Sequence, residues 1–155
     1  MLRRPMKLLE ILDERLIKVP LESEDKEEAI EELVDVLVRA GRITDRNAAL
    51  NAIHEREAKQ TTAIGNGVAV PHGKDKSVSV LTCAVGTSPK GIEFDSIDGK
   101  PVHAVFLLLA QANNPGPHLA ALAEIARILE FPTVRNTLFA ARTSAEVLQI
   151  IRKME

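Results

Sequence analysis

The sequence predicts an α/β fold: a single-domain sandwich in which a central mixed β-sheet is flanked by helices on both faces. Segments with helical periodicity alternate with short apolar runs of strand length, and further helices follow at the end of the chain. The 155 residues contain no Gly/Ser-rich or Pro-rich linker, so residues 1–155 are expected to form one domain. The turn residues Asp98 and Gly99 lie between two strand-like runs, which favours at least one antiparallel pair and hence a mixed sheet.

Two helices are expected in the first part of the chain. Apolar residues recur at helical spacing over residues 25–40, with acidic residues in the first turn, Ser23 as a plausible N-cap and Gly41 as a stop. A second helix is expected over residues 44–59, beginning at the Thr-Asp pair.

The periodicity then changes to that of strands. Residues 63–67, rich in glycine, are interpreted as a turn. The expected strands that follow are 68–70 (halted by Pro71), 77–86, a weaker 91–94, and the apolar run 102–110.

Three helices are expected at the end of the chain. Pro117 suits the first position of a helix that continues to Glu130. Two shorter helices should follow over residues 133–141 and 144–153, the latter with Ser144 as its cap.

Composition excludes several classes of protein. Aromatic residues make up 3% of the chain, Trp and Tyr are absent, and the net charge is −2, so neither base stacking nor a basic surface favours nucleic acid as a partner. The single cysteine, Cys83, lies in an apolar run and is expected to be a buried, reduced thiol. No secretory signal is evident, and the longest strongly apolar stretch, residues 104–110, is too short to cross a bilayer. We therefore expect a cytoplasmic protein with no direct membrane insertion.

The most unusual motif is the glycine-rich run over residues 64–74, which contains Pro71-His72-Gly73. It is expected to place an imidazole at the end of a strand, where Gly73 lets backbone N–H groups approach an anion. Imidazole is a neutral nucleophile near pH 7 and can carry a phosphoryl group on nitrogen. On these residues alone, a turn histidine that makes one hydrogen bond is the competing interpretation.

Two further residues are compatible with the same chemistry. His118 is expected in the first turn of a helix, where exposed N–H groups and the helix dipole favour a negative partner. Arg56 could stabilise a transferring phosphoryl group. Taken separately, the first is as easily an exposed first-turn residue, and the second a solvated arginine between two glutamates.

Together these motifs resemble a known family. The matching segments, which extend over about residues 7–152, are Arg56-Glu57-Ala58, Gly65-Asn66-Gly67-Val68-Ala69-Val70-Pro71-His72-Gly73, Phe94-Asp95-Ser96-Ile97-Asp98-Gly99-Lys100-Pro101-Val102, and His118-Leu119 followed by Leu122. They are similar to the fructose/mannitol-type (type 2) enzyme IIA of the sugar phosphotransferase system.

The resemblance implies specific functions for three residues. His72 would be the phosphorylated residue, with Nε2 as the favoured atom, Arg56 the active-site arginine, and His118 a second histidine that supports the phosphate without carrying it. The donor would be a phosphohistidine on an HPr-type carrier protein, transfer would be in line, and neither metal nor cofactor would be required.

Other polar residues receive weaker expectations. Lys74 could contact phosphate or partner. His103 stands where relatives often carry Asp, and no catalytic function is assigned to it or to His54. A zinc site on His72 and His118 is disfavoured, because no His or Cys cluster supplies further ligands.

Within this family two functions remain possible. A nitrogen-type regulatory IIA controls target proteins by binding them in one phosphorylation state, whereas a sugar-transport IIA passes phosphate to a IIB domain. The absence of a fused domain and the segment 94–100 favour the nitrogen-regulatory branch. Genes near this one would separate the two. The oligomeric state, monomer or homodimer, is left open, since aliphatic helix faces suit a core and a dimer equally.

Overall fold

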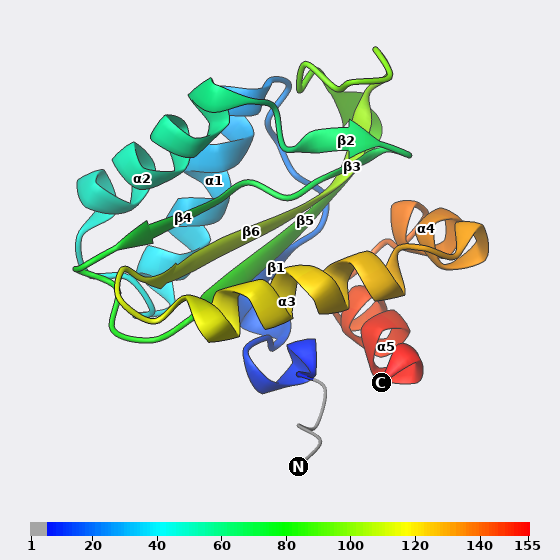
Figure 1. The fold of residues 1–155 in the computed structure, drawn as a ribbon. Coiled ribbons are helices and arrows are strands. Elements are labelled where there is room, and N and C mark those ends of the chain that lie inside the picture. The colour runs from blue at the N-terminus through cyan, green and yellow to red at the C-terminus, as the bar shows by residue number, and fades with distance from the viewer. Residues whose placement is uncertain (1–5) are drawn as a thin grey trace.

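A six-stranded mixed sheet forms the centre of the molecule (Figure 1), in a computed structural model that describes residues 6–155. The strands are β1 (Ile17–Lys18), β2 (Ala63–Gly65), β3 (Val68–Ala69), β4 (His72–Asp75), β5 (Thr82–Ile92) and β6 (Val102–Gln111). Their order is β1-β5-β6-β3-β2, and β4 also pairs with β6. The pairs β5–β6 and β2–β3 are antiparallel, whereas β1–β5, β3–β6 and β4–β6 are parallel. The predicted mixed sheet is confirmed.

Helices cover both faces of this sheet. The α-helices of the described chain are α1 (Lys26–Arg39), α2 (Arg46–Lys59), α3 (Pro115–Ile128), α4 (Pro132–Phe139) and α5 (Ser144–Met154), and two short 3₁₀ helices, Leu8–Glu10 and Glu14–Leu16, precede β1. Figure 1 shows α1 and α2 together on one side of the sheet and α3 on the other. Neighbouring residues of β6, such as Phe106 and Leu107, point to opposite faces and are both fully buried.

Three helix starts differ from the predictions. Asp25, not Ser23, is the N-cap of α1, where its side chain accepts from the Glu28 N–H at 3.0 Å. Thr143, not Ser144, caps α5. Helix α3 begins at Pro115, two residues before Pro117. Both Thr143 and Ser144 could cap α5. Ser144 does not, because its Oγ donates instead to the Ile17 carbonyl oxygen at 2.6 Å.

The predicted strands 77–86 and 91–94 are wrong in their boundaries. They form one strand, β5, which begins only at Thr82 and continues to Ile92. The Asp75 side chain accepts hydrogen bonds from both Ser77 N–H (2.8 Å) and the Ser77 hydroxyl, which closes a turn just before the expected strand.

The segment predicted as a turn over residues 63–67 is in part a strand. β2 and β3 form a tight antiparallel hairpin around Asn66 and Gly67, whose φ angles are 60° and 77°. Two successive residues with positive φ are typical of the type I′ hairpin turn, for which Asn-Gly is the preferred pair.

Strands β3 and β4 lie one after the other along the same edge of β6. Val68 and Ala69 pair with Ala104 and Val105, and His72 pairs with Leu108. Pro71, which has no N–H to donate, lies at the interruption between the two strands. His72 is therefore the first residue of β4, and the prediction that it ends a strand is wrong.

Candidate active site

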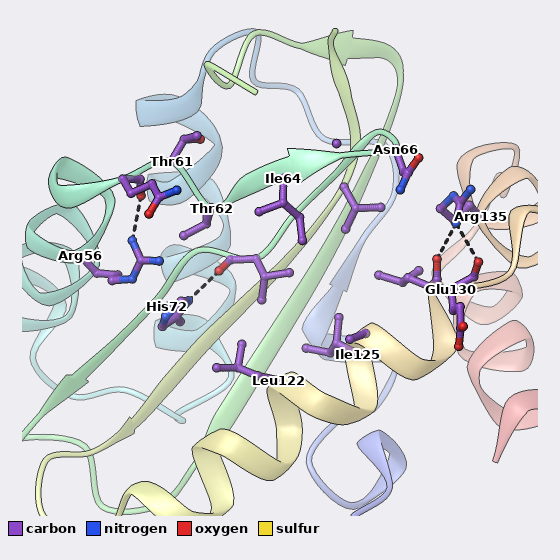
Figure 2. A pocket seen from close by; sticks show the side chains of 16 residues that line it. Arg56, Thr61, Thr62, Ile64, Asn66, His72, Leu122, Ile125, Glu130 and Arg135 are labelled. Carbon is purple, nitrogen blue, oxygen red and sulfur yellow. Dashed lines mark hydrogen bonds between the residues drawn. The ribbon is translucent and has the colours of Figure 1, made fainter. Parts of the chain in front are cut away.

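Three elements meet at His72: the start of β4, the C-terminal turn of α2 and the first turns of α3. Gly73 faces α2, where a Cβ atom would lie 2.9 Å from the Ala52 backbone carbon, so β4 approaches this helix closely. His72, the preceding residue of the strand, points to the opposite face of the sheet, towards α3. Its ring centroid lies 5.1 Å from that of His118, with the two rings in an edge-to-face arrangement. Arg56 lines both pockets that contain His72 (Figure 2). The structure thus brings together all three residues that the sequence singled out.

The hydrogen bond of His72 fixes its tautomer. Nδ1 lies 2.8 Å from the carbonyl oxygen of Val70. A carbonyl oxygen only accepts hydrogen bonds, so Nδ1 carries the hydrogen and donates it. In the neutral ring, the lone pair is then on Nε2, which is the nitrogen available for attack on an electrophile.

Electrostatics keep His72 neutral. Burial lowers the pKa of His72 below its usual value, and the positive charges of Arg56 and Lys74 lower this pKa further. The hydrogen bond to Val70 and the negative charge of Glu57 oppose the shift. The net effect is a pKa below the ordinary 6.5, so the unprotonated, nucleophilic ring predominates at neutral pH.

His118 is the more deeply buried of the two histidines, with only 2% of its surface exposed. Burial, followed by the proximity of His72 and Lys74, lowers the pKa of His118 to about 4. Its Nδ1 atom is buried without a hydrogen-bond partner among the described residues. A buried polar atom of this kind is costly unless something fills its hydrogen-bonding capacity, which is a common property of functional sites.

Arg56 is held at the end of α2 by a local hydrogen bond. Its Nη1 donates to the carbonyl oxygen of Gln60 at 2.8 Å, and its side chain lines the pocket beside His72 (Figure 2). Five N–H donors in a planar fork suit the oxygens of a phosphoryl group. Lys74 lines the smaller pocket beside His72 and His118, so it lies close to the site.

A groove of about 600 Å³ extends from His72 between the β2–β3 hairpin and α3. One wall is apolar and comes from α3 and the sheet, and Arg135 lies at the far end. Two large apolar side chains at the two pockets are exposed: Ile64 (70%), beside the groove, and Leu119 (64%), at the smaller pocket. Exposed apolar side chains grouped around a reactive residue are typical of a surface that contacts another protein.

The remaining candidates lie elsewhere. His103 contacts the Ser88 carbonyl and packs on Phe139, away from the three site residues. Cys83 is free and fully buried, as predicted, and burial raises the pKa of its thiol to about 12. Residues 6–155 contain no group of three or more His, Cys, Asp or Glu side chains arranged to hold a metal ion. Over the same residues, no helix combines the length and apolar character needed to span a membrane.

Sequence reasoning assigned no function to three residues at the end of α2 that are hydrogen-bonded to one another or to Arg56, namely Glu57, Gln60 and Thr62. A glutamate followed five residues later by a threonine, across the end of a helix, was the only available signal. The two side chains can meet only because α2 ends at Lys59 and the chain changes direction at Gln60. Hydrophobic periodicity does not predict this change of direction.

Comparison with known proteins identifies the family. Residues 10–154 match the family described as "Phosphoenolpyruvate-dependent sugar phosphotransferase system, EIIA 2". The chain is 40% identical over 129 residues to the fructose-specific EIIA component of Haloferax volcanii, covering 83% of this chain and 84% of that protein. It is 38% identical over 148 residues to the fructose-specific EIIABC component of Bacillus subtilis, covering 96% of this chain but only 23% of that longer protein.

Solved structures agree with this result. The nitrogen regulatory protein IIA-Ntr of Neisseria meningitidis superposes with a TM-score of 0.86 at 30% identity, covering 93% of this chain and 98% of that one. The Escherichia coli mannitol enzyme IIA, solved in complex with phosphorylated enzyme IIB, shares the fold with a TM-score of 0.80 at 23% identity, covering 92% and 97%. The chain therefore belongs to the EIIA 2 family of the phosphoenolpyruvate-dependent sugar phosphotransferase system and is a phosphoryl carrier of that system.

Proposed function

We propose that this protein accepts a phosphoryl group on Nε2 of His72 from a phosphohistidine of an HPr-type carrier and passes it to a second protein. The observation that carries the proposal is the hydrogen bond from Nδ1 to the Val70 carbonyl, which leaves the Nε2 lone pair free in a neutral ring. No general base is needed, because the attacking nitrogen has no proton to lose. As the new N–P bond forms, the donor's N–P bond breaks and its electron pair returns to the donor ring.

Arg56 and His118 are assigned to the charge on the phosphoryl oxygens. The guanidinium of Arg56 provides fixed N–H donors, since one of its nitrogens is anchored to Gln60. His118 is neutral at pH 7, given its pKa of about 4, and supports the phosphate by donating a hydrogen bond from one ring nitrogen rather than by carrying a charge. Its deep burial leaves little room for it to be the phosphorylated residue itself.

The acceptor defines two versions of this function. The first is a nitrogen-type regulatory protein, which binds target proteins according to its phosphorylation state. Support comes from the match to the IIA-Ntr protein of Neisseria meningitidis over nearly the full length of both chains. The second is a fructose-type carrier that passes phosphate to a IIB domain. Support for it comes from the 40% identity to the fructose-specific EIIA of Haloferax volcanii and from the mannitol IIA solved with phosphorylated IIB.

A reconstituted relay tests the phosphoryl transfer. The protein is incubated with phosphoenolpyruvate, enzyme I and an HPr-type carrier, and acid-labile phosphate is mapped by mass spectrometry. We expect one label, on His72, which is lost in His72→Ala. Label on any other residue, or none at all, contradicts the proposal.

A chase separates the two acceptors. The purified phosphoprotein is mixed with a fructose-type IIB domain from the same genome. Rapid loss of label to IIB indicates the sugar carrier, whereas retention for many minutes indicates the regulatory version. Neighbouring genes, a sugar permease or a nitrogen sigma factor, provide an independent check.

A further inference from the structure

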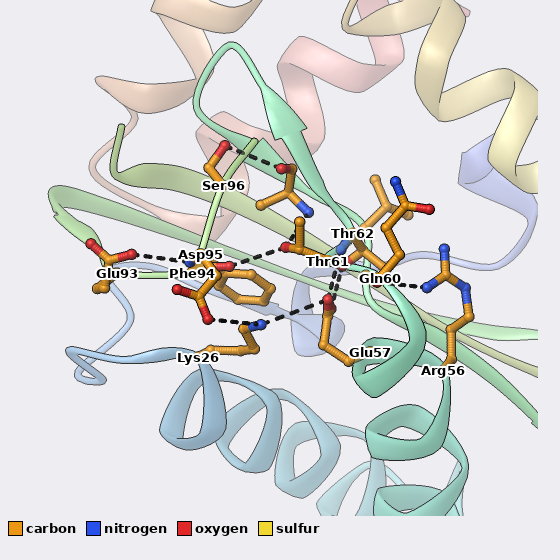
Figure 3. A network of polar contacts seen from close by, with 12 residues as sticks. Lys26, Arg56, Glu57, Gln60, Thr61, Thr62, Glu93, Phe94, Asp95 and Ser96 are labelled. Carbon is orange, nitrogen blue, oxygen red and sulfur yellow. Dashed lines mark hydrogen bonds and ion pairs between the residues drawn. The ribbon is translucent and has the colours of Figure 1, made fainter. Parts of the chain in front are cut away.

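The residues behind the site form a small polar network at the end of α2. Glu57 is only 7% exposed, and its carboxylate binds Thr62 twice: the Thr62 N–H donates to Oε2 at 2.6 Å and the Thr62 hydroxyl donates to Oε1 at 2.5 Å (Figure 3). Thr62 itself is only 5% exposed. We call this pair of residues the Glu57–Thr62 clamp.

A cation from another helix completes the network. Lys26, at the start of α1, lies 3.9 Å from Glu57 Oε2 and 3.7 Å from Asp95 Oδ2, and its ammonium group lies over the Phe94 ring (Figure 3). A buried carboxylate that accepts two hydrogen bonds and lies near a cation is well compensated, so the clamp is a fixed point of the structure.

One branch from the clamp leads to Arg56. The clamp closes the turn over residues 60–62, and within this turn the Gln60 carbonyl accepts the hydrogen bond that holds the Arg56 guanidinium. Arg56 and Glu57 are adjacent on α2, and each contacts the turn that follows the helix. If the turn were released, the guanidinium would lose its anchor.

The other branch leads to His72. The carbonyl oxygen of Thr62 accepts a hydrogen bond from the Val70 N–H at 3.2 Å. The carbonyl of the same residue, Val70, accepts from His72 Nδ1 at 2.8 Å. Thr62 is therefore two hydrogen bonds away from the ring whose tautomer decides whether Nε2 can react.

We propose that Glu57 and Thr62 are the positioning residues of this active site, a single clamp that fixes both the guanidinium of Arg56 and the Nδ1–H tautomer of His72. This inference rests on the proposed function. Neither residue touches the phosphoryl group: they act through the Gln60 carbonyl on one side and the Val70 carbonyl on the other. A well-supported catalytic group needs such a second layer of contacts to stay within the narrow geometry that in-line transfer requires.

The chain contains a matched control for this clamp. Glu32 on α1 also accepts from backbone N–H groups and a hydroxyl in a preceding loop: Glu22 N–H at 3.0 Å, Ser23 N–H at 3.1 Å and Ser23 Oγ at 2.5 Å. A lysine, Lys18, lies 3.9 Å away. Glu32 therefore makes the same kinds of contact as Glu57, but its hydrogen-bond partners contact no residue of the active site. Glu32→Ala therefore reports the cost of losing a carboxylate clamp as such.

The test is single-turnover transfer from a phosphorylated HPr-type carrier, measured by rapid quench over a range of carrier concentrations. We expect Glu57→Ala to lower the limiting rate constant about 10- to 100-fold, with the carrier concentration at half-maximal rate within about twofold of wild type. Glu32→Ala should stay within about twofold of wild type in both quantities. Each variant is assayed at a temperature well below its own unfolding midpoint, so that a loss of stability does not affect the measured rates.

Milder changes apply if Glu57→Ala does not fold. Thr62→Val removes the hydroxyl at nearly constant shape and should lower the limiting rate several-fold, whereas Thr62→Ser keeps the hydroxyl and should transfer at close to the wild-type rate. A second readout is the ¹⁵N chemical shifts of the His72 ring. In the wild type they should report one tautomer, with hydrogen on Nδ1, whereas Glu57→Gln and Thr62→Val should shift the population towards the Nε2–H form.

The outcomes are distinct. If wild-type protein takes no phosphate on His72, the proposed function is wrong. If the wild type is phosphorylated on His72 but the clamp variants transfer as fast as Glu32→Ala and keep the tautomer unchanged, the positioning proposal is wrong and the clamp only stabilises the fold.

Discussion

His72 and His103 have the same local arrangement in two regions of one sheet. Each ring is half-buried, and each uses Nδ1 to contact a backbone carbonyl oxygen at 2.8 Å, that of Val70 for His72 and that of Ser88 for His103. The surroundings differ. His103 packs on the Phe139 ring with 5.4 Å between centroids. His72 instead opens into two pockets, one shared with His118 and both shared with Arg56.

The comparison separates an interaction that the two histidines share from the features found only at His72. A hydrogen bond from Nδ1 to a carbonyl selects the tautomer of a histidine, which suits a nucleophile. The same hydrogen bond occurs at His103, to which no catalytic function is assigned. What distinguishes His72 is that an arginine and a second histidine, from two different helices, lie around the pockets into which its ring opens. Substitutions in the two regions test this distinction, from the largest expected effect to the smallest.

The largest effect is expected from removing the two rings in turn. His72→Ala should abolish phosphorylation, because the other histidine at the pockets, His118, is only 2% exposed and leaves little room for a phosphoryl group. His103→Ala should be phosphorylated at a rate within a few-fold of wild type. The measurement is incorporation of label in the reconstituted relay. Equal losses in the two variants would remove the distinction between the two regions.

The next effect is expected from the partners of His72. Arg56→Ala should slow transfer by about 100-fold, the typical cost of one donor to a developing charge. His118→Ala should slow it by about 10-fold or more, since its ring offers one donor. Circular dichroism should show both variants folded, because Arg56 lies at the rim of the site and His118 makes no hydrogen bond through Nδ1 that the fold would lose. If either variant unfolds outright, its residue is a structural element and not a support for phosphate.

The packing of β4 on α2 should appear as a stability effect. Gly73→Ala places a methyl group 2.9 Å from the backbone of Ala52, which cannot rotate away, so we expect the free energy of unfolding to fall by about 2 kcal/mol. A methyl group at Gly116, on α3 close to the same site, would meet no neighbouring element within 4 Å, so Gly116→Ala should change stability much less. Urea titration of both variants makes the comparison, and equal midpoints would contradict the close approach of β4 to α2.

The smallest effect concerns acid. The pKa of His118 is lowered to about 4 in the folded protein, whereas the unfolded chain has the ordinary value of 6.5. The unfolded state therefore binds a proton more readily, so this contribution to stability is complete above pH 6.5 and is lost as the pH falls towards 4. Allowing for solvent screening, we expect a loss of about 1 kcal/mol between pH 7 and pH 5.

His118→Gln removes this titrating group and is the control for the acid effect. Its unfolding free energy should depend less on pH than that of the wild type over the same interval. Denaturant titrations at pH 7, 6 and 5 measure the difference. Parallel curves for the two proteins would show that the His118 ring is not shielded from water to the extent that its burial indicates.

Much of the fold was predictable from local signals. Periodicity and capping residues placed the helices to within a few residues, because an amphipathic helix repeats its signal over several turns. Strand boundaries were less accurate. The Asp75–Ser77 turn delays β5. Of the two strands in the Asn66-Gly67 hairpin, the second is predicted as residues 68–70, whereas β2, only three residues long, is predicted as part of the turn.

The sequence by itself determined the family and singled out the three residues that we propose for the site, because Pro71-His72-Gly73, Arg56 and His118 are recognisable by residue type and spacing. Only the tertiary structure decided how they work together. The carbonyls that hold His72 and Arg56 belong to Val70 and Gln60, which are close along the chain, but the backbone that presents these carbonyls is itself held by the contacts of Thr62 with Glu57 and Val70. The low pKa of His118 depends on burial and on its neighbours His72 and Lys74. Burial and backbone conformation are set by how the elements pack together, so a linear pattern of residues does not show them.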